Sequence, residues 1–213
     1  MLFSIATIAA LTTAAFAKCN DYLLISTRGT GELQGPSAGF RTMISETLNQ
    51  VPNGEEYDTK YPAGFDQNTS LGVIDIINKI SDGLQSCPDQ RYALLGYSQG
   101  ATTTLDALNS SNLSEDAKNM IEAVILIGNP YRMPNQQSNV EGLGADNAFG
   151  VASALSKPIP DSFDESGKAL DFCYSDDCIC NVACTGFRSG HLKYGFDMEV
   201  QNQAAQHLIE HLS

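Results

Sequence analysis

Short apolar runs alternate along this chain with segments in which apolar residues recur at helical spacing. The runs that predict strands lie at 22–26, 92–95 and 123–127, with further strands near 57–61 and 169–173. The helical spacing predicts helices at 37–48, from 71 up to Cys87, at 101–108 and at 200–212. Uninterrupted apolar runs are typical of strands covered on both faces, and alternation of strands with helices is typical of parallel βαβ units. The pattern therefore predicts an α/β fold around a mainly parallel sheet.

The segment 129–168 departs from this pattern, because it is rich in Asn, Gln, Gly, Pro and Asp. It predicts surface loops with one short helix near 148–155, and an excursion of this length is a candidate for the substrate side of a site. The chain shows no internal repeat, charge block or interdomain linker. We therefore expect residues 18–213 to form a single domain.

The first 17 residues form a separate unit. They carry no charged side chain, and Ala15, Phe16 and Ala17 make a small-x-small cleavage site. This pattern predicts a secretory signal peptide at 1–17 and an extracellular protein. A membrane span is disfavoured, because the apolar core is shorter than about 18 residues and threonines interrupt it.

The number of cysteines is consistent with an extracellular protein. All six follow residue 17, at Cys19, Cys87, Cys173, Cys178, Cys180 and Cys184. An even number of cysteines in a secreted chain predicts disulfides. A zinc knuckle is the alternative for the last four, but the spacing C-x4-C-x-C-x3-C fits no standard structural zinc site.

The charge balance restricts the class of partner. With 25 acidic and 12 basic residues, the formal net charge is −13. Nucleic acids and anionic membrane surfaces are therefore disfavoured as partners. We expect a monomer that binds neither.

A candidate nucleophile lies between the strand at 92–95 and the following helix. Residues 96–100 read G-Y-S-Q-G, the G-x-S-x-G pattern that places a serine on a sharp turn between a strand and a helix. Glycines two positions before and after the serine suit a turn in which the helix packs close to the strand. The context predicts that Ser98 is a nucleophile.

A serine hydroxyl needs a base, and the base needs an acid that orients it. Of the three histidines, His207 and His211 lie on the final predicted helix, whereas His191 lies in a loop just before it. Asp177 follows the last predicted strand, with Asp176 and Asp171 as rivals. The order Ser98, Asp177, His191 is that of α/β-hydrolases.

A tetrahedral intermediate also needs donors for its oxyanion. The backbone amide of Gln99 follows from the turn itself. Thr30, in the loop after the first strand, is placed to supply a second amide and a hydroxyl.

These motifs together resemble the cutinases. The shared features are Cys19, Arg28-Gly29-Thr30, Cys87, the G-Y-S-Q-G turn, Asp177-x-x-Cys180 and His191-Leu192-Lys193-Tyr194-Gly195. The resemblance implies a small α/β-hydrolase sandwich of three layers without a large lid. It implies a secreted serine esterase without cofactor or metal, most simply one that acts on cutin-type polyesters through an acyl-enzyme on Ser98. It further implies the triad Ser98, Asp177 and His191, the oxyanion donors Thr30 and Gln99, and disulfides between Cys19 and Cys87 and between Cys173 and Cys180, which leave Cys178 and Cys184 to pair.

Two features depart from the simplest family pattern. One is the additional pair Cys178 and Cys184, and the other is Arg188 in a loop that is usually apolar in cutinases. A charge beside the acyl site disfavours long aliphatic chains. The same family includes acetylxylan esterases, so removal of short acyl groups from polysaccharide is the alternative function.

Two further classes of function remain open. His207 to His211 spell H-x-x-E-H, which places two histidines on one helix face as in a zinc hydrolase, although only two residues follow to supply a further ligand. A secreted protein that keeps the fold as a binding or elicitor module without catalysis is the other alternative.

Overall fold

The centre of the protein is a five-stranded parallel sheet with the order β2-β1-β3-β4-β5. A computed structural model describes residues 19–155, 158–185 and 189–213. The strands are β1 (Tyr22–Thr27), β2 (Gly54–Asp58), β3 (Arg91–Tyr97), β4 (Ile121–Ile127) and β5 (Ala169–Phe172). The expected three-layer α/β sandwich with a parallel sheet is confirmed.

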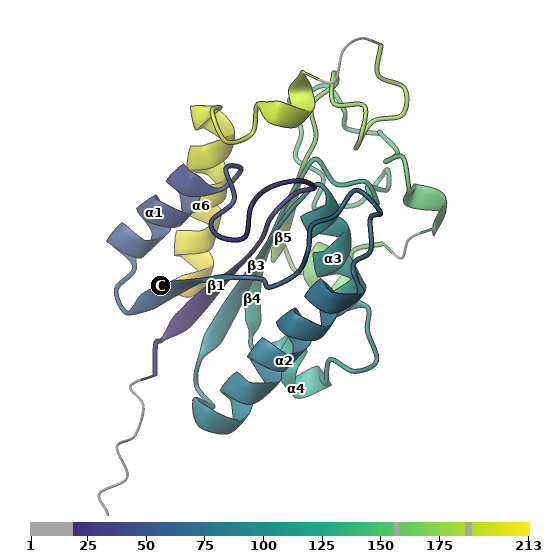
Figure 1. Cartoon of the computed structure of the whole chain (residues 1–213). Helices are drawn as coiled ribbons and strands as arrows, with labels where there is room; N and C mark the ends of the chain where they lie inside the picture. Colours follow the sequence, from purple (N-terminus) through teal and green to yellow (C-terminus); the bar gives the residue numbers. More distant parts are fainter. Residues whose placement is uncertain (1–18, 156–157, 186–188) are drawn as a thin grey trace, which may run out of the picture.

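Helices cover both faces of the sheet (Figure 1). The α-helices are α1 (Arg41–Gln50), α2 (Ser70–Ser86), α3 (Gln99–Leu108), α4 (Glu115–Asn119), α5 (Asp161–Asp164) and α6 (Met198–Leu212), and two short 3-10 helices are η1 (Ser153–Leu155) and η2 (Gly190–Leu192). Figure 1 shows α1 and α6 together on one face and α2, α3 and α4 on the other. None of the helices that the structure describes is both long and apolar enough to cross a membrane.

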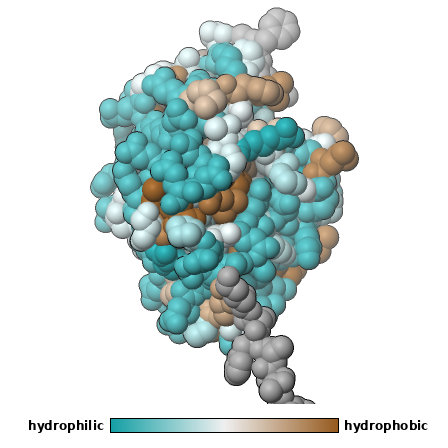
Figure 2. Space-filling model, turned by 90° about the vertical axis from the view of Figure 1, so that its left-hand side faces the viewer, coloured by the Kyte–Doolittle hydropathy of each residue, from teal (hydrophilic) through white to brown (hydrophobic). Residues whose placement is uncertain are grey.

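Each face of the sheet has its own hydrophobic core. Alternate side chains of β1 divide between them, with Tyr22 and Leu24 packed beneath α1 and α6, and Leu23 and Ile25 packed beneath α2 and α3. This alternation follows from the period of two in a strand and explains why β1 is apolar throughout. Figure 2 shows the α1 and α6 side as mainly hydrophilic, with apolar side chains gathered over these two helices.

The secondary structure differs from the sequence-based expectation in two regions. The edge strand β2 lies at Gly54–Asp58 instead of 57–61, because its residues are mostly polar and partly exposed and leave no apolar run to detect. The predicted helix at 148–155 is reduced to η1. The short α4 and α5 were not predicted, since helices of five and four residues carry too few apolar positions to show a period.

Three disulfides join the six cysteines. They pair Cys19 with Cys87, Cys173 with Cys180 and Cys178 with Cys184, with Cα–Cα distances of 5.7, 5.9 and 5.2 Å. These are the pairs that the family resemblance implied. Three disulfides in a chain of this size fit an extracellular protein.

The edge strand β2 carries a pair of carboxylates that makes stability depend on pH. Burial, and then the Asp58 charge, raise the pKa of Glu56 to about 6 from 4.5. A raised pKa in the folded state stabilises the protein below about pH 4.5, and this contribution is lost as the pH rises through about 6. We therefore expect Glu56→Gln to stabilise the fold at pH 8 by up to about 1 kcal/mol, after allowing for solvent screening, and to have no effect at pH 4.

Urea denaturation of the wild type and of Glu56→Gln at both pH values measures this difference. The matched control is Glu55→Gln, which removes an exposed carboxylate from the adjacent position of the same strand. An equal response of the two variants to pH would contradict the interpretation.

Candidate active site

Ser98 occupies a strained turn between β3 and α3. Its backbone φ of 54° and ψ of −120° lie in a region that residues with side chains rarely adopt. A Cβ at Gly96 would lie 2.6 Å from the Cα of Ala101, and a Cβ at Gly100 would lie 1.9 Å from the Thr27 carbonyl oxygen. Both glycines are therefore required by the close packing of α3 against the sheet, as the pentapeptide predicted.

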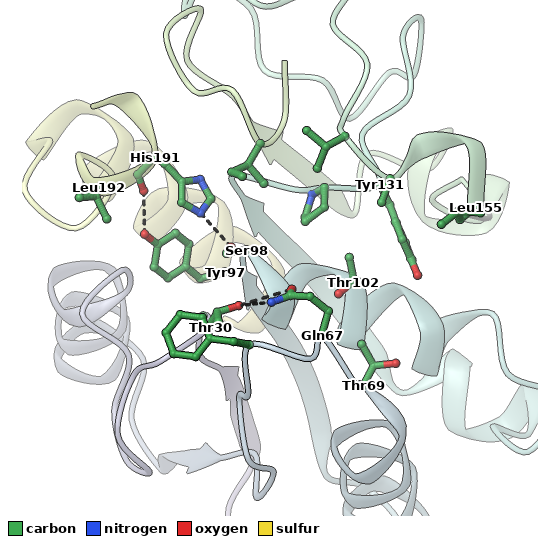
Figure 3. A pocket seen from close by; sticks show the side chains of 16 residues that line it. Thr30, Gln67, Thr69, Tyr97, Ser98, Thr102, Tyr131, Leu155, His191 and Leu192 are labelled. Atoms are coloured by element: carbon green, nitrogen blue, oxygen red, sulfur yellow. Dashed lines mark hydrogen bonds between the residues drawn. The ribbon is translucent and has the colours of Figure 1, made fainter. Parts of the chain in front are cut away.

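The loops that follow β1, β3, β4 and β5 meet at the carboxyl end of the sheet, because the strands are parallel and all end there. There the Nε2 of His191 lies 2.8 Å from the Oγ of Ser98. The Nδ1 of His191 lies 3.0 and 2.9 Å from the two carboxylate oxygens of Asp177. Figure 3 shows the imidazole directed at Ser98. The structure thus brings the three predicted residues into one hydrogen-bonded chain.

The directions of these hydrogen bonds follow from the chemistry of the partners. An ionised carboxylate only accepts, so His191 Nδ1 carries the proton and Nε2 is left as the acceptor for the Ser98 hydroxyl. In this tautomer His191 can take the serine proton, and Asp177 can stabilise the resulting imidazolium. The arrangement can therefore activate Ser98 for attack on a carbonyl.

The rival acids lie in other contacts. Asp176 accepts hydrogen bonds from Lys193 and Ser189, both at 2.7 Å, and the Lys193 ammonium lowers the pKa of its carboxyl. Asp171 is buried within β5, where Arg132 Nη1 lies 3.3 Å from its carboxylate. Burial raises the pKa of Asp171, while Arg132 opposes that shift. Only Asp177, which is fully buried, contacts the His191 ring among these three.

The two histidines of the H-x-x-E-H sequence lie on α6, away from this chain of hydrogen bonds. Their rings are 4.4 Å apart, and Nε2 of His207 donates to the Lys168 carbonyl at the start of β5, the end of that strand opposite Ser98. Burial lowers the pKa of His207. Within the described ranges, no group of three or more His, Cys, Asp or Glu residues is arranged to hold a metal ion.

Thr30 and Gln99 lie beside Ser98 where the oxyanion donors were expected. The backbone amide of Gln99 is the first of α3, and helix geometry leaves such an amide without an acceptor inside the helix. The Thr30 hydroxyl lies 3.2 Å from Oε1 of Gln99 and accepts a hydrogen bond of 3.0 Å from Nε2 of Gln67 (Figure 3). Sequence reasoning missed Gln67, because nothing in its loop marks it as a neighbour of Thr30.

Three further residues contact the triad and were not predicted as site residues. Tyr97 donates a hydrogen bond of 2.7 Å to the His191 carbonyl, and Tyr194 donates one of 2.6 Å to the Asp177 carboxylate. A Cβ at Gly128 would lie 2.7 Å from the His191 ring. The sequence signals for the two tyrosines are weak: Tyr97 directly precedes Ser98, and Tyr194 follows His191 by three residues.

An open cleft of about 580 Å³ lies over Ser98 and His191. The cleft is lined by polar residues, including Thr30, Gln67 and Thr69, and by apolar residues, including Val151, Leu155 and Ile179. Among the described residues, none of those that line the cleft is Asp, Glu, Lys or Arg. The part of the chain that the structure describes places no lid over the cleft. The expected charge of Arg188 at this site lies outside the described residues.

Comparison with known proteins identifies the family. The cutinase family model matches residues 18–212. This chain belongs to the cutinase family. The solved structure of a cutinase-like protein from Cryptococcus sp. is 39% identical, with a TM-score of 0.85 over 93% of this chain and 98% of that chain.

Other proteins that this chain matches are longer or share only the fold. A cutinase from Kineococcus radiotolerans is 27% identical over 84% of this chain and 57% of its own length. The chain spans about half the length of the first curated cutinases that it matches. The catalytic core of acetyl xylan esterase from Trichoderma reesei, 22% identical with a TM-score of 0.76, covers 91% of this chain and 100% of its own and shows the same fold.

Proposed function

We propose that this protein is a secreted serine esterase of the cutinase type that cleaves carboxylic esters through an acyl-enzyme on Ser98. The observation that carries the proposal is the chain of hydrogen bonds from the Ser98 hydroxyl through His191 to the buried Asp177. The cutinase family membership and the three disulfides support it. In this proposal the ester is the partner, and the protein acts as a monomer outside the cell.

The reaction divides into two halves. Ser98 Oγ attacks the ester carbonyl while His191 Nε2 takes its proton, and the Gln99 amide and Thr30 hold the oxyanion. His191 then gives the proton to the leaving alcohol as the carbonyl–oxygen bond breaks and the acyl-enzyme forms. In the second half, water attacks the acyl carbonyl and loses a proton to His191. His191 then gives this proton to Ser98 Oγ as the bond to the acyl group breaks and the carboxylic acid leaves. Asp177 stays ionised throughout and stabilises the imidazolium.

The rim of the cleft favours an aliphatic polyester as the substrate. Leu155, Phe65 and Leu192 line the cleft and are 85%, 87% and 70% exposed. Apolar side chains that remain in water beside a reactive serine suit an apolar substrate that covers them on binding. Acetylated xylan is the second candidate, because Thr30, Gln67 and Thr69 also line the cleft and offer hydrogen bonds.

A panel of p-nitrophenyl esters from acetate to palmitate, with cutin and acetylated xylan, tests the proposal. We expect hydrolysis of short and medium acyl chains and release of hydroxy fatty acids from cutin. Activity on acetate and acetylated xylan alone would replace the cutinase assignment with that of an acetylxylan esterase. No hydrolysis of any ester, with an intact fold by circular dichroism, would overturn the enzymatic proposal in favour of a binding role.

A further inference from the structure

We propose that Tyr194 is a positioning residue that acts on the triad through Asp177, and the inference rests on the proposed esterase function. Its phenol oxygen lies 2.6 Å from Oδ2 of Asp177, the same oxygen that lies 2.9 Å from His191 Nδ1. Two donors that are three residues apart in the chain therefore share Oδ2, while His191 Nδ1 also lies 3.0 Å from Oδ1. By this contact Tyr194 sets both the orientation of Asp177 and how strongly the pair retains a proton on His191.

The carboxylate of Asp177 is shielded from solvent. Its other oxygen accepts a hydrogen bond of 2.9 Å from the backbone amide of Ile179. Asp177 is 0% exposed and Tyr194 is 1% exposed, so bulk solvent does not compete for either group. Among the described residues, His191, Tyr194 and Ile179 are the donors to this carboxylate, which depends on each of them for its orientation and charge distribution.

Tyr194 is itself held by contacts that do not involve the triad. Its ring packs against the Tyr174 ring with centroids 4.9 Å apart, and its carbonyl accepts a hydrogen bond of 2.8 Å from Gln201. A Cβ at the next residue, Gly195, would lie 2.1 Å from the Ala38 carbonyl oxygen, so the backbone there is pressed against the loop before α1. These contacts make the phenol a rigid donor.

The phenol stays protonated over the pH range in which an esterase works. Burial raises the pKa of Tyr194 well above its usual range, and the charge of Asp177 raises it further. Tyr194 therefore donates to Asp177 at acidic, neutral and mildly alkaline pH.

The direction of its effect follows from electrostatics. A carboxylate that accepts a phenol hydrogen bond carries less free charge on that oxygen, here Oδ2, one of the two oxygens within 3.0 Å of His191 Nδ1. Without the phenol, that oxygen attracts the imidazolium more strongly, so His191 keeps its proton to a higher pH. A protonated His191 cannot take the Ser98 proton, and the active fraction at acidic pH falls.

Other charged and titratable groups surround the triad and do not change when the phenol is removed. Among the described residues they include Asp171 and its partner Arg132 beneath the site, Asp176 and its partner Lys193 on the surface, Tyr97 with the nearby Glu32, and Tyr174 with its partner Asp197. A shift of the pH profile in a Tyr194 variant is therefore assigned to the lost hydrogen bond.

The test is the pH profile of kcat/KM for Tyr194→Phe with a soluble p-nitrophenyl ester. We expect the acidic limb to move to higher pH by about one unit and kcat to fall about tenfold, with KM nearly unchanged. The matched control is Tyr174→Phe, which removes a tyrosine–carboxylate hydrogen bond of 2.6 Å to Asp197 outside the triad and should leave the profile unmoved. A Tyr194→Phe profile that superimposes on the wild type, or moves to lower pH, overturns the proposal.

Two further measurements keep the test independent of folding and of esterase activity. Site-specific 3-fluorotyrosine at position 194 keeps the shape of the ring but is a stronger donor, so the acidic limb should move to lower pH, and no movement contradicts the proposal. NMR titration of the His191 ring nitrogens should give a higher midpoint in Tyr194→Phe even if the wild type hydrolyses no ester. Inactive wild type would thus refute the esterase function alone, whereas an unchanged midpoint would refute the role of Tyr194.

Discussion

The Ser98→Ala variant is expected to lose ester hydrolysis by about 10⁴- to 10⁶-fold, because no other group replaces the nucleophile. Alanine removes only the hydroxyl, and the turn geometry at φ of 54° is imposed by the packing of α3 on the sheet. We therefore expect the fold and the urea midpoint to remain close to those of the wild type. Initial rates on p-nitrophenyl butyrate measure the loss.

A serine on the surface provides the matched control for this variant. Ser45 lies exposed on α1, and its hydroxyl contacts only the Thr42 carbonyl among the described hydrogen bonds. Ser45→Ala should retain the wild-type rate. Labelling by a serine-directed phosphonate should disappear in Ser98→Ala and persist in Ser45→Ala. Full activity in Ser98→Ala would contradict the proposed mechanism.

The Asp177→Asn variant is expected to lower kcat about 10⁴-fold. The amide of asparagine can donate to His191 Nδ1, which favours the tautomer with the proton on Nε2. That nitrogen then cannot accept the proton of Ser98, although it still lies 2.8 Å away. The loss therefore arises from the wrong tautomer and not from altered distances.

Asp176→Asn separates the role of Asp177 from the general effect of removing a negative charge. Asp176 is the adjacent residue, and it binds Lys193 and Ser189 instead of the imidazole. We expect its kcat to stay within about threefold of the wild type, since a surface ion pair contributes little. A large loss in Asp176→Asn together with an active Asp177→Asn would reverse the assignment of the acid. Rate measurements at saturating ester compare the two variants.

The parts of the fold that were predictable are those in which local sequence and tertiary environment demand the same residues. Strands β1, β3 and β4 are buried on both faces, so they appear as apolar runs. The edge strand β2 is mostly polar because its side chains are exposed or only partly buried, and its bounds were therefore misplaced. The described part of the segment from 129 to 168 showed no period because it holds only η1 and the four-residue α5 and otherwise bonds as a loop, as Ser138 and Val140 do to Asp171 of β5.

The candidate site divides in the same way. Ser98 was visible in the sequence because its turn constrains its neighbours, with glycines at both flanks. Gln67 and Tyr194 were not, because each depends on a contact with a residue far away in the chain, Thr30 and Asp177. Side-chain contacts of this kind leave no local spacing to detect.

The sequence by itself determined the α/β class, the nucleophile turn at Ser98 and the candidate base His191, because strand and turn chemistry is local. The sequence favoured Asp177 over Asp171 and Asp176, but only the tertiary structure shows which of these carboxylates lies against the imidazole. The tertiary structure also decided that Tyr194 reaches the triad. Those choices depend on distances across the folded chain, which are set by the packing of β5, η2 and α6 around the carboxyl edge of the sheet.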